Sequence, residues 1–194
     1  MNKRTVTLIA LAAVVGAGCG SEPAAQPETA PAVETAAVET AAVEPTAPDL
    51  ITLVKNGKMP LPGVLTGGQP TDEQFAALRD AGYATVINLR QPDERGSRGE
   101  AEKVGELGMT YVSIPVDGKA GLNEENAAAL AEALEAAEYP VLLHCGSGNR
   151  VGALLAVKAF QLDGASAEEA LELGLAGGVT RLEPVVRELL GLVE

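Results

Sequence analysis

The segment 141–153 constrains the fold of this chain more than any other. It reads VLLHCGSGNRVGA, so an apolar run ends at the single histidine and a cysteine, and a glycine-rich turn leads through an arginine into an alanine- and leucine-rich pattern. This order predicts a buried strand that delivers Cys145 to the edge of a sheet and a helix that begins near Val151. The chain must therefore pass from strand to helix within a short loop.

That loop has the composition of an anion-binding site. Gly146 and Gly148 allow consecutive backbone N–H groups to point inward, and the following helix adds the positive end of its dipole. Arg150 can hold two oxygens of a tetrahedral anion with its planar guanidinium. The same field favours the thiolate of Cys145, which is the nucleophilic form of cysteine.

Three other residues of the segment have supporting roles in this interpretation. Ser147 and Asn149 are candidates to orient the loop or a water molecule. The side chain of His144 points to the face of the strand opposite that of Cys145. We therefore expect His144 to order the loop through a hydrogen bond rather than to act as a base.

The N-terminus, residues 1–19, has the features of a lipoprotein signal peptide. Two basic residues precede an apolar run too short to span a bilayer, and Gly16-Ala17-Gly18 precede Cys19. We expect Cys19 to be lipidated and to become the first mature residue, although the glycine at 16 departs from the leucine usual there. The alternatives are an ordinary signal peptide with an incidental cysteine, or a short uncleaved anchor.

Residues 20–49 are expected to form a disordered tether. They are rich in alanine, proline, glutamate and threonine, and the repeat AVETA has a five-residue period that matches neither a helix face nor a strand. The folded domain is then 50–194, one domain by its size.

Composition excludes several functions. After loss of residues 1–19, the chain has twelve basic and 27 acidic residues. The resulting net charge of −15 disfavours nucleic acid as a partner. Attraction of an anion must then be local. One histidine and one remaining cysteine argue against a metal site, and no cofactor is expected.

Strand and helix patterns alternate along the domain, which predicts an α/β fold with a mostly parallel sheet and helices on both faces. Ligands bind such sheets beyond the carboxyl ends of the strands, where Cys145 lies. The expected strands are 52–54, 64–66, 84–89, 109–114 and 141–144, and the expected helices are 71–81, 100–107, 123–137, 151–162, 166–175 and 182–192.

Four ordered motifs resemble bacterial dual-specificity-phosphatase-like domains, above all those of beta-lactamase-hydrolase-like proteins. They are LTGGQPT at 65–71, GYATVINLR at 82–90, YVSIPV at 111–116 and HCGSGNR at 144–150. The resemblance covers about residues 63–184. It implies the cysteine-phosphatase fold, with Cys145 as nucleophile and Arg150 as anion clamp.

Two features separate the chain from typical phosphatases. Only four residues lie between Cys145 and Arg150, where those enzymes have five, and Val151 replaces a hydroxyl residue that assists the thiolate. Phosphatases also need a general acid. Asp117, 28 residues before the cysteine, fits this role, although it can equally be a solvated turn residue. Asp93 and Glu94 are weaker candidates.

Three functions remain open. The first is an exported phosphatase that forms a phosphocysteine and acts on a phosphorylated small molecule or protein. The second is a rhodanese-type sulfurtransferase with a Cys145 persulfide, which takes sulfur from a sulfane-sulfur donor. The third is a non-catalytic module that binds an anion or phospho-ligand. We expect the lipid on Cys19 to anchor the protein to the cell envelope, at the outer membrane facing the periplasm.

Residues outside the segment have simpler interpretations. Arg90 is expected to pair with an acid at the end of its strand, with a place in the pocket as the alternative. Gly177, Gly178 and Arg181 are candidates to border the site.

Overall fold

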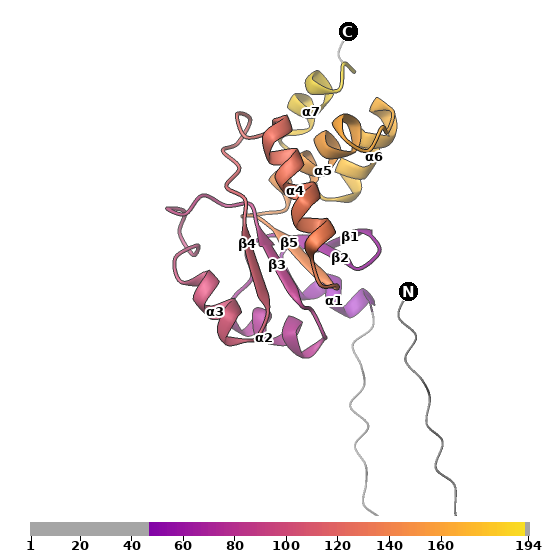
Figure 1. Ribbon diagram of the computed structural model, residues 1–194. Helices are drawn as coiled ribbons and strands as arrows, with labels where there is room; N and C mark the ends of the chain where they lie inside the picture. The colour runs from indigo at the N-terminus through magenta and orange to yellow at the C-terminus, as the bar shows by residue number, and fades with distance from the viewer. Residues whose placement is uncertain (1–46, 193–194) are drawn as a thin grey trace, which may run out of the picture. The chain divides into compact units, whose positions relative to one another are not determined.

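A five-stranded sheet forms the centre of the computed structural model, which describes residues 47–192 (Figure 1). Its strand order is β1-β2-β5-β3-β4, in which β1 is antiparallel to β2 and every other pair is parallel. The predicted α/β architecture is therefore confirmed. The strands are β1 (Lys58–Leu61), β2 (Val64–Gly67), β3 (Thr85–Asn88), β4 (Thr110–Ser113) and β5 (Val141–His144).

Helices cover both faces of the sheet (Figure 1). One apolar cluster joins α4, α5, α6 and α7 to one face, and a second joins α1, α2 and α3 to the other. The helices are α1 (Ala47–Leu53), α2 (Asp72–Asp80), α3 (Glu100–Glu106), α4 (Glu124–Ala136), α5 (Asn149–Gln161), α6 (Ala167–Ala176) and α7 (Glu183–Leu189).

The central strand β5 contributes to both clusters. Val141 and Leu143 pack toward α4 and α5, whereas Leu142 packs toward α2. This alternation of side chains continues past the strand, so Cys145 joins the first cluster while the ring of His144 stacks edge-on against that of Phe75 in α2. The two neighbouring residues thus act on opposite sides of the sheet, as the sequence predicts.

Side chains cap the starts of three helices. Thr71 and Ser166 form capping boxes at the starts of α2 and α6, and the side chain of Asn123 caps α4. In each case a side-chain oxygen accepts a backbone N–H that the first helical turn leaves without a partner.

The prediction of a strand at 52–54 is wrong, because residues 47–53 form α1. Leu50, Ile51 and Leu53 pack against the second cluster from that helix, and this packing overrides the preference of isoleucine and threonine for strands. Strand β1 was not expected. Its sequence KMPL contains a lysine and a proline, features of an edge strand that leave little alternating pattern.

The predicted signal peptide and nearly all of the predicted tether lie outside the described residues. The last three tether residues, 47–49, belong to α1. None of the helices in the described part of the chain combines the length and the apolar character needed to cross a membrane.

The contact between α5 and α6 gives a test of the fold. A methyl group on Gly152 would meet the backbone nitrogen of Val179 and the carbonyl oxygen of Gly174, whereas one on Gly105 in α3 would meet nothing within 4 Å. We expect Gly152→Ala to lower the free energy of unfolding by about 2–3 kcal/mol because backbone atoms must move. Gly105→Ala, the control, should raise it by about 0.5–1 kcal/mol. Urea denaturation of the full chain measures both, and equal effects would contradict this packing.

Candidate active site

Cys145 lies directly after β5, at the carboxyl ends of the parallel strands, as expected. The residue is 1% exposed, and its Sγ accepts a hydrogen bond of 3.2 Å from the N–H of Gly148. Gly148 has a φ of 85° and is the residue before α5. This left-handed conformation favours glycine and turns the loop back over the sulfur.

The loop between β5 and α5 presents unused hydrogen-bond donors. Within residues 47–192, the N–H groups of Gly146, Ser147, Asn149 and Arg150 donate to no acceptor. They lie at the start of a helix of 13 residues, whose dipole adds positive potential at the same end. An anion is the ligand that such a group of donors fits.

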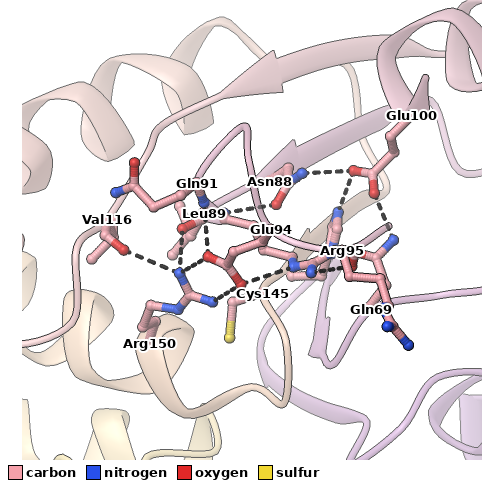
Figure 2. Close-up of polar contacts among 12 residues, drawn as sticks. Gln69, Asn88, Leu89, Gln91, Glu94, Arg95, Glu100, Val116, Cys145 and Arg150 are labelled. Carbon is pink, nitrogen blue, oxygen red and sulfur yellow. Dashed lines mark hydrogen bonds and ion pairs between the residues drawn. The ribbon is translucent and has the colours of Figure 1, made fainter. Parts of the chain in front are cut away.

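Arg150 is held in place by three segments (Figure 2). Its Nη1 donates to Glu94 Oε1 at 2.6 Å and its Nη2 to Glu94 Oε2 at 2.8 Å, which makes a bidentate ion pair. Nη1 also donates to the carbonyl oxygens of Leu89 at 3.4 Å and Val116 at 3.1 Å. Nε and the second N–H of Nη2 donate to no oxygen of the described residues, so two donors of the guanidinium remain for a ligand.

The guanidinium also borders the anion loop. A methyl group placed on Gly146 would lie 3.7 Å from Nη2 of Arg150, so the two are close neighbours. The hydrogen bond that Arg150 donates to Glu94 is the largest cause that raises the pKa of Arg150, and the charge of Cys145 raises it further. Figure 2 shows Cys145 beside this ion pair. Cys145 and Arg150, which the sequence predicts to be the nucleophile and the anion clamp, therefore lie close together.

Glu94 is ionised at neutral pH. The hydrogen bond from Arg150 is the largest cause that lowers the pKa of Glu94 to about 2, and burial opposes it. The backbone N–H of Gln91 and the side chain of Arg90 lower it further. A carboxylate held in this state has no proton to give, so Glu94 is not a candidate general acid. The sequence shows it only as one of several charges in a loop.

Asp117 follows the residue whose carbonyl oxygen contacts Arg150, so its backbone lies next to the clamp. Its side chain is exposed and makes no hydrogen bond with the described residues. Its carbonyl oxygen accepts the N–H of Gly121 at 2.9 Å, which closes a turn. Both interpretations from the sequence, general acid and turn residue, agree with this geometry. Asp93 is exposed and has no contact with Arg150.

A buried polar network lies on the other side of the sheet from Cys145. His144 Nε2 is 3.0 Å from Glu100 Oε1, which also accepts a hydrogen bond of 2.8 Å from Asn88. The hydrogen bond expected of His144 is made to this carboxylate. Glu100 was not foreseen, because in the sequence it is simply an acid in the first turn of a helix.

Two further side chains connect this network to the ion pair. Gln69 Nε2 donates to Glu100 Oε2 at 2.5 Å, and Gln69 Oε1 accepts from Arg90. Arg90 in turn donates from Nε to Glu94 Oε2 at 3.2 Å. The expected pairing of Arg90 with an acid is confirmed, and that acid is the partner of Arg150.

The side chain of Asn149 faces away from the anion loop. Its Oδ1 accepts hydrogen bonds from the N–H of Thr180 at 2.8 Å, the hydroxyl of Thr180 at 3.1 Å and the N–H of Leu182 at 3.2 Å. Asn149 therefore fastens the segment between α6 and α7 to the anion loop, which brings Arg181 close to the site as the sequence suggested. No group of three or more metal-ligating side chains occurs in the part of the chain that the structure describes.

Comparisons with known proteins agree with this geometry. The family model described as "DSP-PTPase phosphatase fused to NAD+ Kinase" matches residues 56–176. A beta-lactamase hydrolase-like protein of Xylella fastidiosa is 33% identical over 116 residues, which are 57% of this chain and 26% of that protein. The match thus spans about a quarter of the length of that relative.

Solved structures share the fold. A protein of the DUF442 group from Shewanella putrefaciens has a TM-score of 0.56 and 23% identity, over 73% of this chain and 92% of that one. A cysteine-to-serine variant of Pseudomonas aeruginosa TpbA, in complex with phosphotyrosine, has a TM-score of 0.52 and 20% identity, over 66% of this chain and 78% of that one. The resemblance noted in the sequence is confirmed.

The ion pair between Arg150 and Glu94 predicts a particular dependence of stability on pH. Because the pKa of Glu94 is about 2 in the folded protein and 4.5 without the pairing, its contribution is complete above about pH 5. It is lost as the pH falls toward 2. Glu94→Gln should therefore destabilise the protein most at pH 7, by about 1–3 kcal/mol, and progressively less at pH 4 and pH 3.

Urea denaturation of parent and variant at these three pH values measures the difference. Glu135→Gln is the control, since Glu135 is an exposed residue of α4. A destabilisation by Glu94→Gln that stays constant from pH 7 to pH 3 would show that the ion pair does not hold the loop.

Proposed function

The chain belongs to the family described as "DSP-PTPase phosphatase fused to NAD+ Kinase", and from that premise we propose that it hydrolyses phosphoric monoesters through a phosphocysteine on Cys145. The observation that carries the proposal is that three features meet at the start of α5. They are the sulfur of Cys145, the free backbone N–H groups of the loop, and the guanidinium of Arg150 held by Glu94. These are a nucleophile and an anion cradle at contact distance.

In the first step the thiolate of Cys145 attacks phosphorus in line with the bond to the leaving oxygen. The P–S bond forms as the P–O bond breaks. Arg150 and the free N–H groups of the loop bind the equatorial oxygens, and because these donors are already oriented, little reorganisation opposes the reaction. Asp117 gives a proton to the leaving oxygen, which departs as an alcohol or phenol.

In the second step a water molecule attacks the phosphorus of the phosphocysteine. The P–O bond forms, the P–S bond breaks, and inorganic phosphate leaves while the thiolate is regenerated. Asp117, now ionised, accepts the proton of the water. Val151 is fully buried and offers no hydroxyl to the sulfur. The N–H of Gly148 is the donor to Sγ among the described residues.

The short loop favours a second candidate function, sulfur transfer. Four residues separate Cys145 from Arg150, and the residue that carries the sulfur is 1% exposed, which suits a single terminal sulfur atom. In that reaction the thiolate takes the sulfane sulfur of thiosulfate, releasing sulfite and forming a persulfide. Cyanide then removes this sulfur as thiocyanate and the thiolate is regenerated. No general acid is needed.

We propose further that the enzyme is exported and held at the cell envelope by a lipid on Cys19, at the outer membrane facing the periplasm. The proposal rests on the basic start, the apolar run and the small residues before Cys19, and on the long stretch poor in large apolar side chains that follows. A lipidated Cys19 would leave Cys145 without a cysteine partner, so the nucleophile would remain a free thiol in an oxidising compartment.

Two parallel assays distinguish the candidate reactions. One follows phosphate release from p-nitrophenyl phosphate, and the other follows thiocyanate formation from thiosulfate and cyanide. We expect phosphate release from the full chain and a loss of at least about a thousandfold in kcat/KM for Cys145→Ser. Thiocyanate formation without phosphate release would show that the site catalyses sulfur transfer. Activity in neither assay would support a binding module, and full activity of Cys145→Ser would overturn both enzymatic reactions.

A further prediction concerns the general acid. We expect Asp117→Asn to lower kcat about a hundredfold for an alkyl phosphate, whose leaving group needs a proton, and less than about tenfold for p-nitrophenyl phosphate. Asp93→Asn, in the neighbouring exposed loop, is the matched control and should change neither rate. If Asp117→Asn slows both substrates equally, or neither of them, Asp117 is not the proton donor.

A further inference from the structure

A cavity of about 450 Å³ adjoins the anion loop. We call it the basic pocket. No acidic side chain is among its lining residues, which include Lys55, Asn56, Lys58, Ser147, Thr180 and Arg181. Ser147 belongs to the loop that follows the nucleophile, so the basic pocket and the proposed site of phosphoryl transfer share a wall.

The three cations of the basic pocket are unusual in this chain. The protein has 27 acidic and 14 basic residues, so most basic side chains are expected to have a carboxylate nearby. The side chains of Lys55, Lys58 and Arg181 form no ion pair and no hydrogen bond within residues 47–192. Most other cations of this region are paired with acids, namely Arg79, Arg90, Lys103, Lys119, Arg150, Lys158 and Arg187.

Both walls of the basic pocket are fastened to the anion loop. On one side Asn56 donates from Nδ2 to the carbonyl oxygen of Ser147 at 3.1 Å. Asn56 has a φ of 56° and is the one non-glycine residue with positive φ in the described part of the chain. Such a conformation costs free energy and persists where surrounding contacts require it. The segment between α1 and β1, with Lys55 in it and Lys58 at the start of β1, is thus held against the anion loop.

On the other side Asn149 holds the segment that carries Arg181. Its Oδ1 accepts the N–H groups of Thr180 and Leu182, the residues on either side of Arg181. Asn149 also precedes Arg150 directly. The backbone segments that carry the three cations are therefore held against the residues around Cys145, although Lys55 and Lys58 are more than a hundred residues from Arg181 in the chain.

We propose that the basic pocket is a second anion subsite, which binds another phosphate group of the same small-molecule substrate while the first occupies the loop at Cys145. This inference rests on the proposed phosphatase function and names its substrate class, small molecules with two or more phosphate groups. Ammonium and guanidinium groups are the usual phosphate ligands of proteins. In a strongly acidic protein they also offset the repulsion that a substrate with several negative charges meets.

The size of the cavity agrees with this occupant. A volume of about 450 Å³ exceeds that of a single phosphate and leaves room for part of the body that joins two phosphates. A substrate with one phosphate cannot occupy the anion loop and the basic pocket at the same time, whereas a substrate with two phosphates can contact the exposed cations Lys55, Lys58 and Arg181 as well. The basic pocket therefore discriminates in favour of the more highly charged molecule.

Binding to the full chain tests the proposal without requiring turnover. Titration calorimetry compares inorganic pyrophosphate with inorganic phosphate, and fructose 1,6-bisphosphate with fructose 6-phosphate. We expect at least one doubly phosphorylated probe to bind ten times or more tightly than its singly phosphorylated partner. In the variant that combines Lys55→Gln, Lys58→Gln and Arg181→Gln, this ratio should fall below about threefold.

A matched variant controls for net charge. Arg79→Gln, Lys158→Gln and Arg187→Gln together remove the same number of charges from α2, α5 and α7, outside the basic pocket. This variant should keep the tenfold ratio. Equal ratios in the two triple variants, or no preference for either doubly phosphorylated probe in the parent, would overturn the proposal. The proposal would also be overturned if the variant of Lys55, Lys58 and Arg181 lost affinity for an acidic phosphotyrosine peptide but not for the doubly phosphorylated probes. The pocket would then be a peptide site.

The experiment separates this inference from the proposed function. If the affinity ratio between doubly and singly phosphorylated probes changes as expected but no phosphate ester is hydrolysed, the second subsite is supported and the proposed phosphatase reaction is overturned. If p-nitrophenyl phosphate is hydrolysed through Cys145 but the affinity ratio does not depend on Lys55, Lys58 and Arg181, the phosphatase reaction is supported and the second subsite is overturned.

Discussion

The ion pair between Arg150 and Glu94 connects segments of the chain that are otherwise separate. Arg150 lies in the first turn of α5, Glu94 in the loop after β3, and the carbonyl oxygen of Val116 in the loop after β4. A half-buried guanidinium is costly to remove from water, and here a carboxylate and two carbonyl oxygens compensate that cost. The loops around Cys145 therefore have a common anchor, and the guanidinium of Arg150 is oriented before any ligand arrives.

The sheet separates Cys145 from a buried polar network. Cys145 packs with α5 on one face, while His144, Glu100 and Asn88 form a buried hydrogen-bonded group on the other. Gln69 and Arg90 extend this group to Glu94. These hydrogen bonds join residues at the ends of β2, β3 and β5, so they hold the three strand ends relative to one another. The anion loop begins at that fixed edge.

Charge in this protein is organised locally. The surface as a whole is acidic, yet Arg150, the free N–H groups of the loop and the cations of the basic pocket lie side by side. This contrast confines the attraction of an anion to one small region. The two asparagines that border the anion loop on either side, Asn56 and Asn149, keep that region together by bonding to backbone groups of other segments.

The sequence alone determined the local features of this protein. The strand, glycine turn and helix around Cys145, the caps at Thr71, Asn123 and Ser166, and the α/β alternation all follow from neighbouring residues. Only the tertiary structure decided that Ile51 is helical, that Glu94 pairs with Arg150, that Glu100 bonds to His144, and that Lys55 and Lys58 lie near Arg181. The physical reason is that these outcomes depend on contacts between residues far apart in the chain, for which the sequence contains no local pattern.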